Sequence, residues 1–167
     1  EVDLIAARDG HLFVLEVKST FIRRSQRDAW LHASTTLRKA GRQLARKVDV
    51  ITRALAQEGS LRAGLGIAPD RRLAGCHAWI VDTSIERDHM RFSGFLKISV
   101  EELLIALRDD ADLLADPDGL LSGRSLAEES PSRIDAPRPS ATLYPQGFRA
   151  DRLVEVIETE IVWKAIG

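Results

Sequence analysis

Asp3, Glu16 and Lys18 are the residues near the start of the chain whose types and spacing could support chemistry. Two carboxylates held side by side repel each other, and a cation between them would relieve that repulsion. Mg²⁺ suits such a position because it prefers oxygen ligands and keeps several of its waters. Lys18 could instead neutralise one of the two carboxylates. The three residues therefore predict a metal site or an ion pair, provided that the fold brings Asp3 to Glu16.

A β-hairpin around Asp9-Gly10 is the element that would bring these side chains together. The Asp-Gly pair lies between two apolar runs and favours a type I′ turn, in which both central residues have positive φ. A two-residue turn pairs Arg8 with His11. The same register places Asp3 directly opposite Glu16. Side chains alternate along a strand, so one face carries Leu12, Val14, Glu16 and Lys18, and the other carries Phe13, Leu15 and Val17.

The simpler alternative is that Asp3, Glu16 and Lys18 form a solvated polar stripe at the edge of a sheet. Charged residues are common on exposed strand faces, and a Glu-x-Lys pattern alone carries little information. The register set by the Asp-Gly turn and the strongly apolar flanks favour a functional site over a stripe.

The segment EVDLIAARDGHLFVLEVKS resembles the central hairpin of the PD-(D/E)XK nuclease superfamily, which has the restriction-endonuclease-like fold. In that superfamily an Asp on one strand and a Glu-x-Lys on the next carry the chemistry. The resemblance implies a metal held by Asp3, Glu16 and the carbonyl of Val17. It also implies that Lys18 lies near the attacking water.

The resemblance extends beyond the hairpin. It covers residues 1–20 closely and residues 21–107 in the general order hairpin, helix, strand, helix. It implies an α/β fold with a mixed central β-sheet flanked by helices. Val2 stands where the namesake Pro often lies, and the upstream helix and first strand of many members are missing. We therefore expect a restriction-endonuclease-like core without these two elements, and an upstream domain in the same full-length protein.

Residues 21–58 are basic and have the apolar spacing of a helix. A core-facing stripe is predicted from the positions of Leu37, Ala40, Leu44, Val48, Ile51 and Leu55. The opposite face gathers Arg38, Lys39, Arg42, Arg46 and Arg53. A stripe of like charge costs stability and points to an anionic partner such as a phosphate backbone, whereas a solvated helix surface is the simpler alternative. We expect these five residues and Lys47 to bind nucleic acid.

Gln43 and Lys47 lie one turn apart on a flank between the two faces of this helix. Many nucleases of the resembled superfamily place a Gln, followed about a turn later by Tyr or Lys, on the helix after the Glu-x-Lys strand. The resemblance therefore implies that Gln43 lies near the catalytic residues. The alternative is that Gln43 is an ordinary boundary residue.

The total charge hides a strong asymmetry. The 167-residue chain has 24 basic and 25 acidic side chains and a net charge of −1. Residues 21–55 nevertheless carry a net charge of +7, and residues 101–135 carry −7. Binding depends on the local field rather than on the sum, so the near-neutral total does not argue against a nucleic-acid partner.

Composition also bounds the class of protein. No apolar run approaches the roughly 18 residues needed to cross a bilayer, so we expect a soluble protein with no membrane partner. Cys76 is the only cysteine, which excludes a disulfide framework and a multi-cysteine zinc site. It favours a reducing, cytoplasmic setting.

The chain divides into three expected parts. An α/β core is expected over residues 1–115, with strand, turn, strand and helix over residues 74–108. A loop or partly disordered linker is expected over residues 116–149, where five of the six prolines occur. Residues 150–167 are expected to form a strand or a helix packed on the core. Seven of the fourteen residues in LVEVIETEIVWKAI are β-branched, which favours a strand, but a helix is possible.

The remaining polar and aromatic candidates are weaker. The four histidines have no metal-ligand spacing, so we expect ordinary turn or surface positions for His11, His32, His77 and His89. Asp82 ends an apolar strand and could approach a cleft, but a strand-end Asp usually caps a turn. Positions in or beside the core, rather than base-stacking roles, are expected for Trp30, Trp79 and Trp163.

These patterns together predict a metal-dependent nuclease domain that hydrolyses phosphodiester bonds, with DNA as partner and Mg²⁺ or Mn²⁺ as cofactor. The expected catalytic residues are Asp3, Glu16, Lys18 and Gln43, and the expected metal ligands are Asp3, Glu16 and Val17. One alternative is a catalytically inactive nuclease-like module for nucleic-acid binding or protein assembly. Another is an interaction domain whose basic helix docks onto an acidic partner. The oligomeric state stays open.

Overall fold

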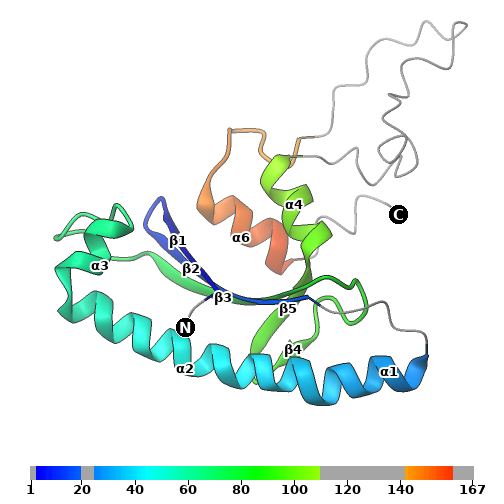
Figure 1. Ribbon diagram of the computed structural model, residues 1–167. Coiled ribbons are helices and arrows are strands. Elements are labelled where there is room, and N and C mark those ends of the chain that lie inside the picture. Colours follow the sequence, from blue (N-terminus) through cyan, green and yellow to red (C-terminus); the bar gives the residue numbers. More distant parts are fainter. Residues whose placement is uncertain (1–2, 20–24, 110–141, 160–167) are drawn as a thin grey trace, which may run out of the picture.

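A five-stranded mixed β-sheet with helices on both faces organises the protein, as a computed structural model of the chain shows (Figure 1). The structure describes residues 3–19, 25–109 and 142–159. The expected α/β class with a mixed central sheet is confirmed. Over the described ranges, no helix is both long enough and apolar enough to cross a membrane.

The sheet has the strand order β1-β2-β3-β5-β4. Its first edge is the antiparallel hairpin of β1 (Leu4–Arg8) and β2 (His11–Lys18). The centre is parallel, because β3 (Gly75–Asp82) runs alongside β2 and β5 (Phe95–Ser99) runs alongside β3. The two-residue strand β4 (Arg91–Phe92), which the sequence did not predict, pairs antiparallel with β5. The carboxyl ends of the three parallel strands therefore meet at one end of the sheet.

The hairpin has the predicted turn and register. Asp9 and Gly10 have φ values of +52° and +88°, as a type I′ turn requires. Arg8 pairs with His11, and the ladder continues to the pair of Leu4 and Leu15. Continuing the same register by one residue places Asp3 opposite Glu16.

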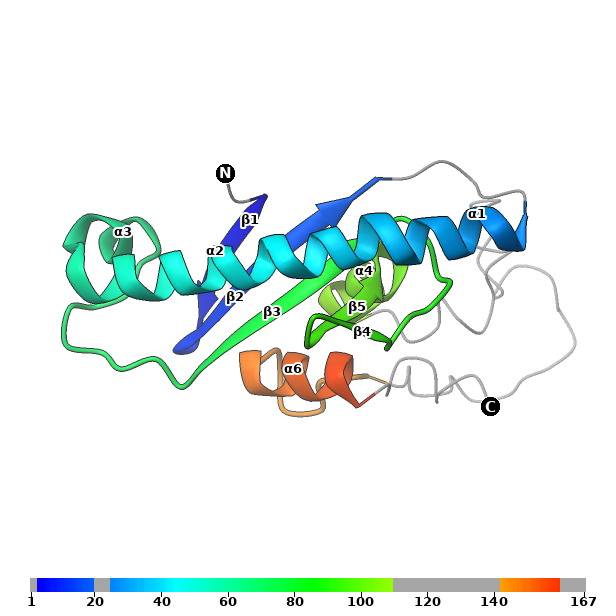
Figure 2. The same ribbon diagram turned by 90° about the horizontal axis from the view of Figure 1, so that it is seen from below.

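One face of the sheet is covered by a long helical segment that crosses the strands (Figures 1 and 2). It consists of α1 (Gln26–Leu31), the π-helix η1 (His32–Leu37) and α2 (Arg38–Gln57). The short helix α3 (Gly59–Gly64), which was not predicted, follows it. The predicted apolar stripe packs on the sheet, with Val48 partly buried and the other members buried: Leu37, Ala40, Leu44, Ile51 and Leu55.

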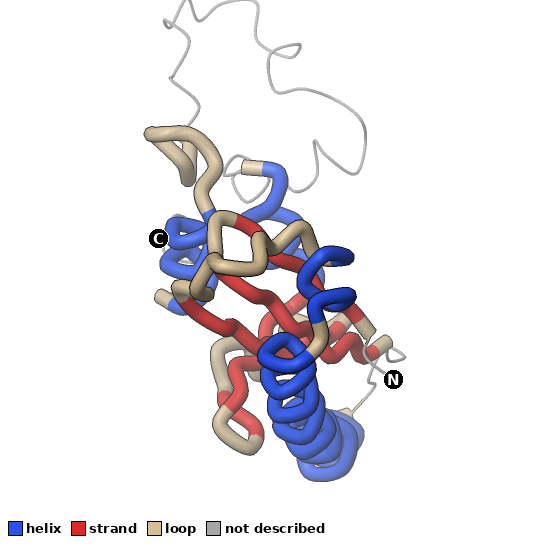
Figure 3. The backbone as a smooth tube through the Cα atoms, turned by 90° about the vertical axis from the view of Figure 1, so that its left-hand side faces the viewer, coloured by secondary structure: helices blue, strands red, loops and turns tan. Residues whose placement is uncertain are grey.

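The opposite face of the sheet packs against α4 (Val100–Arg108) and α6 (Ala150–Glu158), so that helices enclose the strands from two sides (Figure 3). Phe13 and Leu15 point into this second core, whereas Leu12 and Val14 point toward α2. The predicted alternation of the hairpin is thereby confirmed.

The open choice between strand and helix in the last segment is settled in favour of a helix as far as Glu158. The rest of that segment, residues 160–167, lies outside the described residues. The expected linker over residues 116–149 also lies mostly outside them. Near its end, however, Leu143 and Tyr144 are buried in the core beside α4 and α6.

Strands β4 and β5 form a second hairpin, here called the β4 hairpin. Gly41 lets α2 approach this hairpin closely, because a Cβ at this position would lie 2.3 Å from the carbonyl oxygen of Phe92. We expect Gly41→Ala to lower the free energy of unfolding by about 1–3 kcal/mol, because the clash outweighs the gain in helix propensity. Urea denaturation measures this change. Gly64→Ala is the matched control, since its Cβ would meet nothing within 4 Å. A denaturation midpoint for Gly41→Ala equal to that of Gly64→Ala would contradict the close approach.

Tyr144 is the only tyrosine, so its ionisation can be followed directly. Its hydroxyl donates a 2.6 Å hydrogen bond to the carbonyl of Ala106. Burial, followed by the charge of Asp109, raises the pKa of Tyr144 to about 12. The unfolded chain titrates near pH 10. The neutral phenol therefore stabilises the fold below about pH 10, and this contribution is lost as the pH rises toward 12.

Phenolate absorbance measures this difference. The absorbance of the native protein should rise near pH 12 and that of the urea-unfolded protein near pH 10. Coincident titration curves would rule out the buried position of Tyr144.

Candidate functional site

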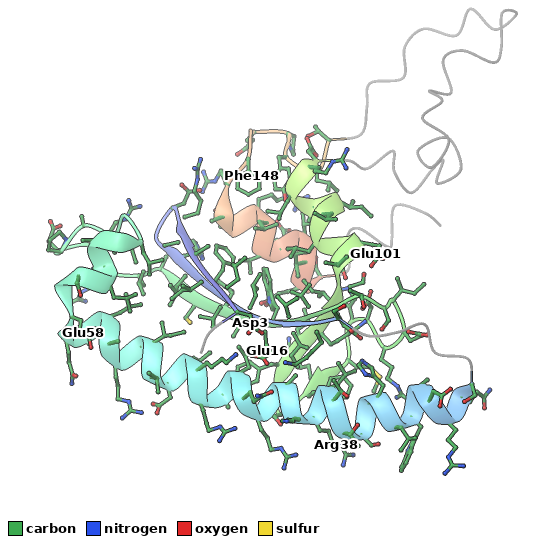
Figure 4. The ribbon with its side chains drawn as sticks, in the orientation of Figure 1. Asp3, Glu16, Arg38, Glu58, Glu101 and Phe148 are labelled. Atoms are coloured by element: carbon green, nitrogen blue, oxygen red, sulfur yellow. The ribbon has the colours of Figure 1, made fainter. Side chains whose placement is uncertain are left out.

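One pocket gathers polar side chains from the hairpin and from α2. Its lining consists of Asp3, Glu16, Lys18, Gln43, Arg46 and Lys47. The pocket lies where the carboxyl end of β2 meets α2, and Figure 4 shows Glu16 between the sheet and this helix. The structure thus brings all four expected catalytic residues together. Two of the six residues expected to bind nucleic acid join them in the pocket.

Asp3 is tied to the neighbouring strand through its carboxylate. Its Oδ2 accepts a 2.8 Å hydrogen bond from the backbone N–H of Val17. Its Oδ1 lies 3.6 Å from the Nζ of Lys47 on α2. Asp3 therefore extends the hairpin beyond β1 and presents its carboxylate at the mouth of the pocket.

Glu16 is a buried carboxylate held between two ammonium groups. Its side chain is 1% exposed. Oε1 accepts a 2.5 Å hydrogen bond from Lys18, and Oε2 accepts one from Lys47. Burying a lone carboxylate is very costly, and two cations with direct hydrogen bonds offset that cost. The ion pair that the sequence offered as the alternative to a metal site is therefore formed.

Lys47 is the residue that joins the two carboxylates to α2. Burial by itself would lower the pKa of Lys47. The hydrogen bond to Glu16 and the charges of Glu16 and Asp3 outweigh burial and raise this pKa above its usual value. Lys47 therefore carries a positive charge throughout the physiological pH range, and it balances the negative charge of the hairpin.

Gln43 contributes an unsatisfied acceptor to the pocket. Its Oε1 is buried and has no hydrogen-bond partner among the residues that the structure describes. Leaving a buried amide oxygen unpaired costs about 1–3 kcal/mol. Such an atom in a polar pocket fits a site that takes up water or a ligand.

The pocket offers oxygen donors of the kind that a divalent metal needs. Within the described part of the chain, no three His, Cys, Asp or Glu side chains lie close enough to form a metal site. Mg²⁺, however, uses one or two carboxylates and keeps several waters. Asp3 and Glu16 supply two carboxylates. The carbonyl of Val17 points to the same side of β2 as its N–H, which binds Asp3. These groups fit a hydrated Mg²⁺ or Mn²⁺, which would have to take the place of the ammonium groups beside Glu16.

The basic face of α2 has the predicted placement. Five side chains on this face are exposed: Arg38, Lys39, Arg42, Arg46 and Arg53. In Figure 4, Arg38 lies on the side of the helix away from the sheet. Arg53 forms an i,i+4 ion pair with Asp49, so its charge is partly compensated. The uncompensated charge is therefore concentrated in the first half of α2.

The sequence-based interpretation missed a buried pair beside Lys18. Asp82 pairs with Lys18 in the register of β2 and β3 and is fully buried. Its Oδ2 accepts hydrogen bonds from His32 at 2.8 Å and from the hydroxyl of Ser84 at 2.7 Å. The expected surface position of His32 is wrong, because its side chain is only 9% exposed. His32 is the first residue of the π-helix η1, and its side chain points inward to Asp82. The signal for Asp82 was its place at the carboxyl end of a strand parallel to β2.

The structure also places the remaining histidines and two of the three tryptophans. His89 lies in a turn, as expected, but its side chain is 9% exposed and bonds the buried Glu102 at 2.8 Å. His11 and His77 bond each other at 3.0 Å. Among the tryptophans, Trp79 is buried as expected, whereas Trp30 is 61% exposed and its expected place in or beside the core is wrong. Trp163 lies outside the described residues.

Lys47→Met removes one of the two cations that hold the buried carboxylate of Glu16. We expect the free energy of unfolding to fall by about 3 kcal/mol, because the carboxylate keeps its burial and loses a partner. Lys39→Met is the matched control on the exposed face of the same helix and should change it by no more than about 0.5 kcal/mol. Urea denaturation at neutral pH compares the two variants. Equal unfolding midpoints would show that the Lys47–Glu16 pair is not formed.

The comparisons with known proteins give no relative on which to base a function. No family model, no curated protein and no solved structure matches this chain.

Proposed function

We propose that this chain is a metal-dependent nuclease domain with a restriction-endonuclease-like core, and that it hydrolyses phosphodiester bonds in DNA. The observation that carries the proposal is the convergence of Asp3, Glu16, Lys18 and Gln43 in one pocket beside the basic face of α2. The resemblance of the hairpin to the PD-(D/E)XK superfamily supports it. The mixed sheet with helices on both faces agrees with that fold.

Asp3, Glu16 and the carbonyl of Val17 would hold Mg²⁺ or Mn²⁺. A divalent ion bound there supplies positive charge to the scissile phosphate and lowers the pKa of a bound water. With Glu16 neutralised, the ammonium group of Lys18 would be available to the substrate. It then donates hydrogen bonds to the phosphate oxygens, where negative charge develops during attack.

Gln43 orients the attacking water in this proposal. Its buried Oε1 lacks a partner in the described structure and can accept a hydrogen bond from water. Holding the water in one orientation lowers the entropic part of the barrier. The exposed arginines of α2 bind phosphates of the DNA backbone, which positions the substrate without selecting its sequence.

Asp3→Ala and Lys18→Met test the catalytic assignment. We expect each variant to lose Mg²⁺-dependent DNA cleavage by at least about 100-fold. Isothermal titration should show loss of Mn²⁺ binding in Asp3→Ala, because a metal ligand is removed. Asp70→Asn is the control, since this exposed acid lies outside the pocket. Cleavage at the unchanged rate in both site variants would refute the proposal.

A catalytically inactive, DNA-binding module is the second candidate. It is favoured by the two lysines that pair with Glu16 and neutralise its charge. This candidate predicts DNA binding with a steep negative salt dependence, no Mn²⁺ binding and no cleavage. An interaction domain for an acidic protein partner would show neither DNA binding nor a metal site.

A further inference from the structure

A second groove lies on the flank of the helical segment opposite the catalytic pocket. It runs between this segment and the β4 hairpin, and ten residues line it. We call it the Trp–Arg groove after its most prominent members: Trp30, Arg38, Arg42, Arg87 and Arg91. None of its ten lining residues is acidic. The groove therefore combines an aromatic ring with a concentrated positive charge.

The four arginines keep their charge available. Arg87 contacts the sulfur of Met90 at 3.9 Å, and Arg91 donates to the carbonyl of Gly94 at 3.1 Å. Neither of these partners is charged. Arg38 and Arg42 form no ion pair with any acidic residue in the described ranges. Four guanidinium groups around one groove repel each other, and an anionic ligand would relieve the repulsion.

Trp30 presents a large aromatic surface that the fold does not use. It lies in α1, which contributes no buried residue to the core. The indole is 61% exposed. Exposing so large an apolar side chain next to cationic groups is typical of surfaces that stack nucleic-acid bases, where aromatic rings and arginines act together.

We propose that the Trp–Arg groove binds a single-stranded segment of nucleic acid. A base stacks on Trp30, and the flanking phosphates bind the four arginines. A duplex does not fit this chemistry, because the faces of its bases are hidden in the stack. An acidic peptide would use the arginines but would leave the indole without a partner.

Two exposed arginines of α2 link the groove to the catalytic pocket along the outer face of the helix. Arg42 lines the groove and Arg46 lines the pocket. These residues are one helical turn apart, about 6 Å along the axis. A single strand held in the groove can therefore follow the arginines across α2 to Asp3 and Glu16. This inference names the substrate class of the proposed nuclease and rests on that proposal only for cleavage, because binding needs no metal.

Fluorescence anisotropy in EDTA tests the groove with a labelled oligothymidylate of about 12 nucleotides, a length within the range that single-strand sites cover. We expect Trp30→Ala to weaken binding about 10-fold and Trp30→Phe to weaken it less, because phenylalanine retains a stacking surface. Phe148→Ala, which removes an exposed aromatic ring outside the groove, should bind as the unaltered protein does.

Salt dependence tests the arginines separately. Arg42→Gln should reduce the slope of log affinity against log salt by about 0.7, the value for one single-strand phosphate contact. Arg149→Gln removes the same charge at a position outside the groove and should leave the slope unchanged. Thermal unfolding of each variant checks that the fold is retained.

Three outcomes would overturn the inference: unchanged affinity in Trp30→Ala, equal or tighter binding of the matching duplex, or equal competition by polyglutamate. The last would identify an acidic protein as the occupant. The two proposals fail separately. Trp30-dependent strand binding without Mg²⁺-dependent cleavage would refute only the nuclease, whereas cleavage with normal binding by Trp30→Ala would refute only the groove.

Discussion

The buried carboxylate of Glu16 is the constraint on which the rest of the structure depends. It lies near the end of the otherwise apolar strand β2, where burial removes almost all of its contact with bulk water. Lys18 comes from the same strand, but Lys47 must be delivered by α2. The helix therefore has to cross the sheet at a fixed position and in a fixed rotation. The apolar stripe that includes Ala40 and Leu44 enforces both, because it packs against the β2 side chains next to Glu16.

This arrangement gives each of the four sides of α2 its own role. Its apolar side forms one half of the protein core. One flank supplies Gln43 and Lys47 to the carboxylates, and the other flank helps to line the Trp–Arg groove. The outer face carries exposed arginines between the two. Because one helix supplies both Lys47 to the carboxylates and Arg42 to the groove, the spacing of these two groups is set by the helix and not by loops.

Local patterns allowed much of this site to be predicted, and distant contacts account for what was missed. The Asp9-Gly10 turn determines the register of the hairpin, and helical spacing identifies the buried side of α2. Neither signal extends to the pairing of His32 with Asp82, which are 50 positions apart and meet only after α1 and β3 are in place. The exposure of Trp30 is likewise a tertiary property, since it depends on α1 reaching beyond the sheet. The strand β4 has too few residues to show a pattern.

The tight turn at Asp9-Gly10 also makes loop length a determinant of chemistry. In a hairpin, one inserted residue shifts the pairing by one position and exchanges the faces of the strand. Asp3 would then point away from Glu16, although every charged residue of the pocket would still be present in the sequence. Asp9 Oδ2 also accepts a hydrogen bond from the N–H of Ala150 at the start of α6, so a longer turn would uncap that helix as well. A related chain that keeps every charged residue of the pocket would therefore have an intact site only if its turn also has two residues.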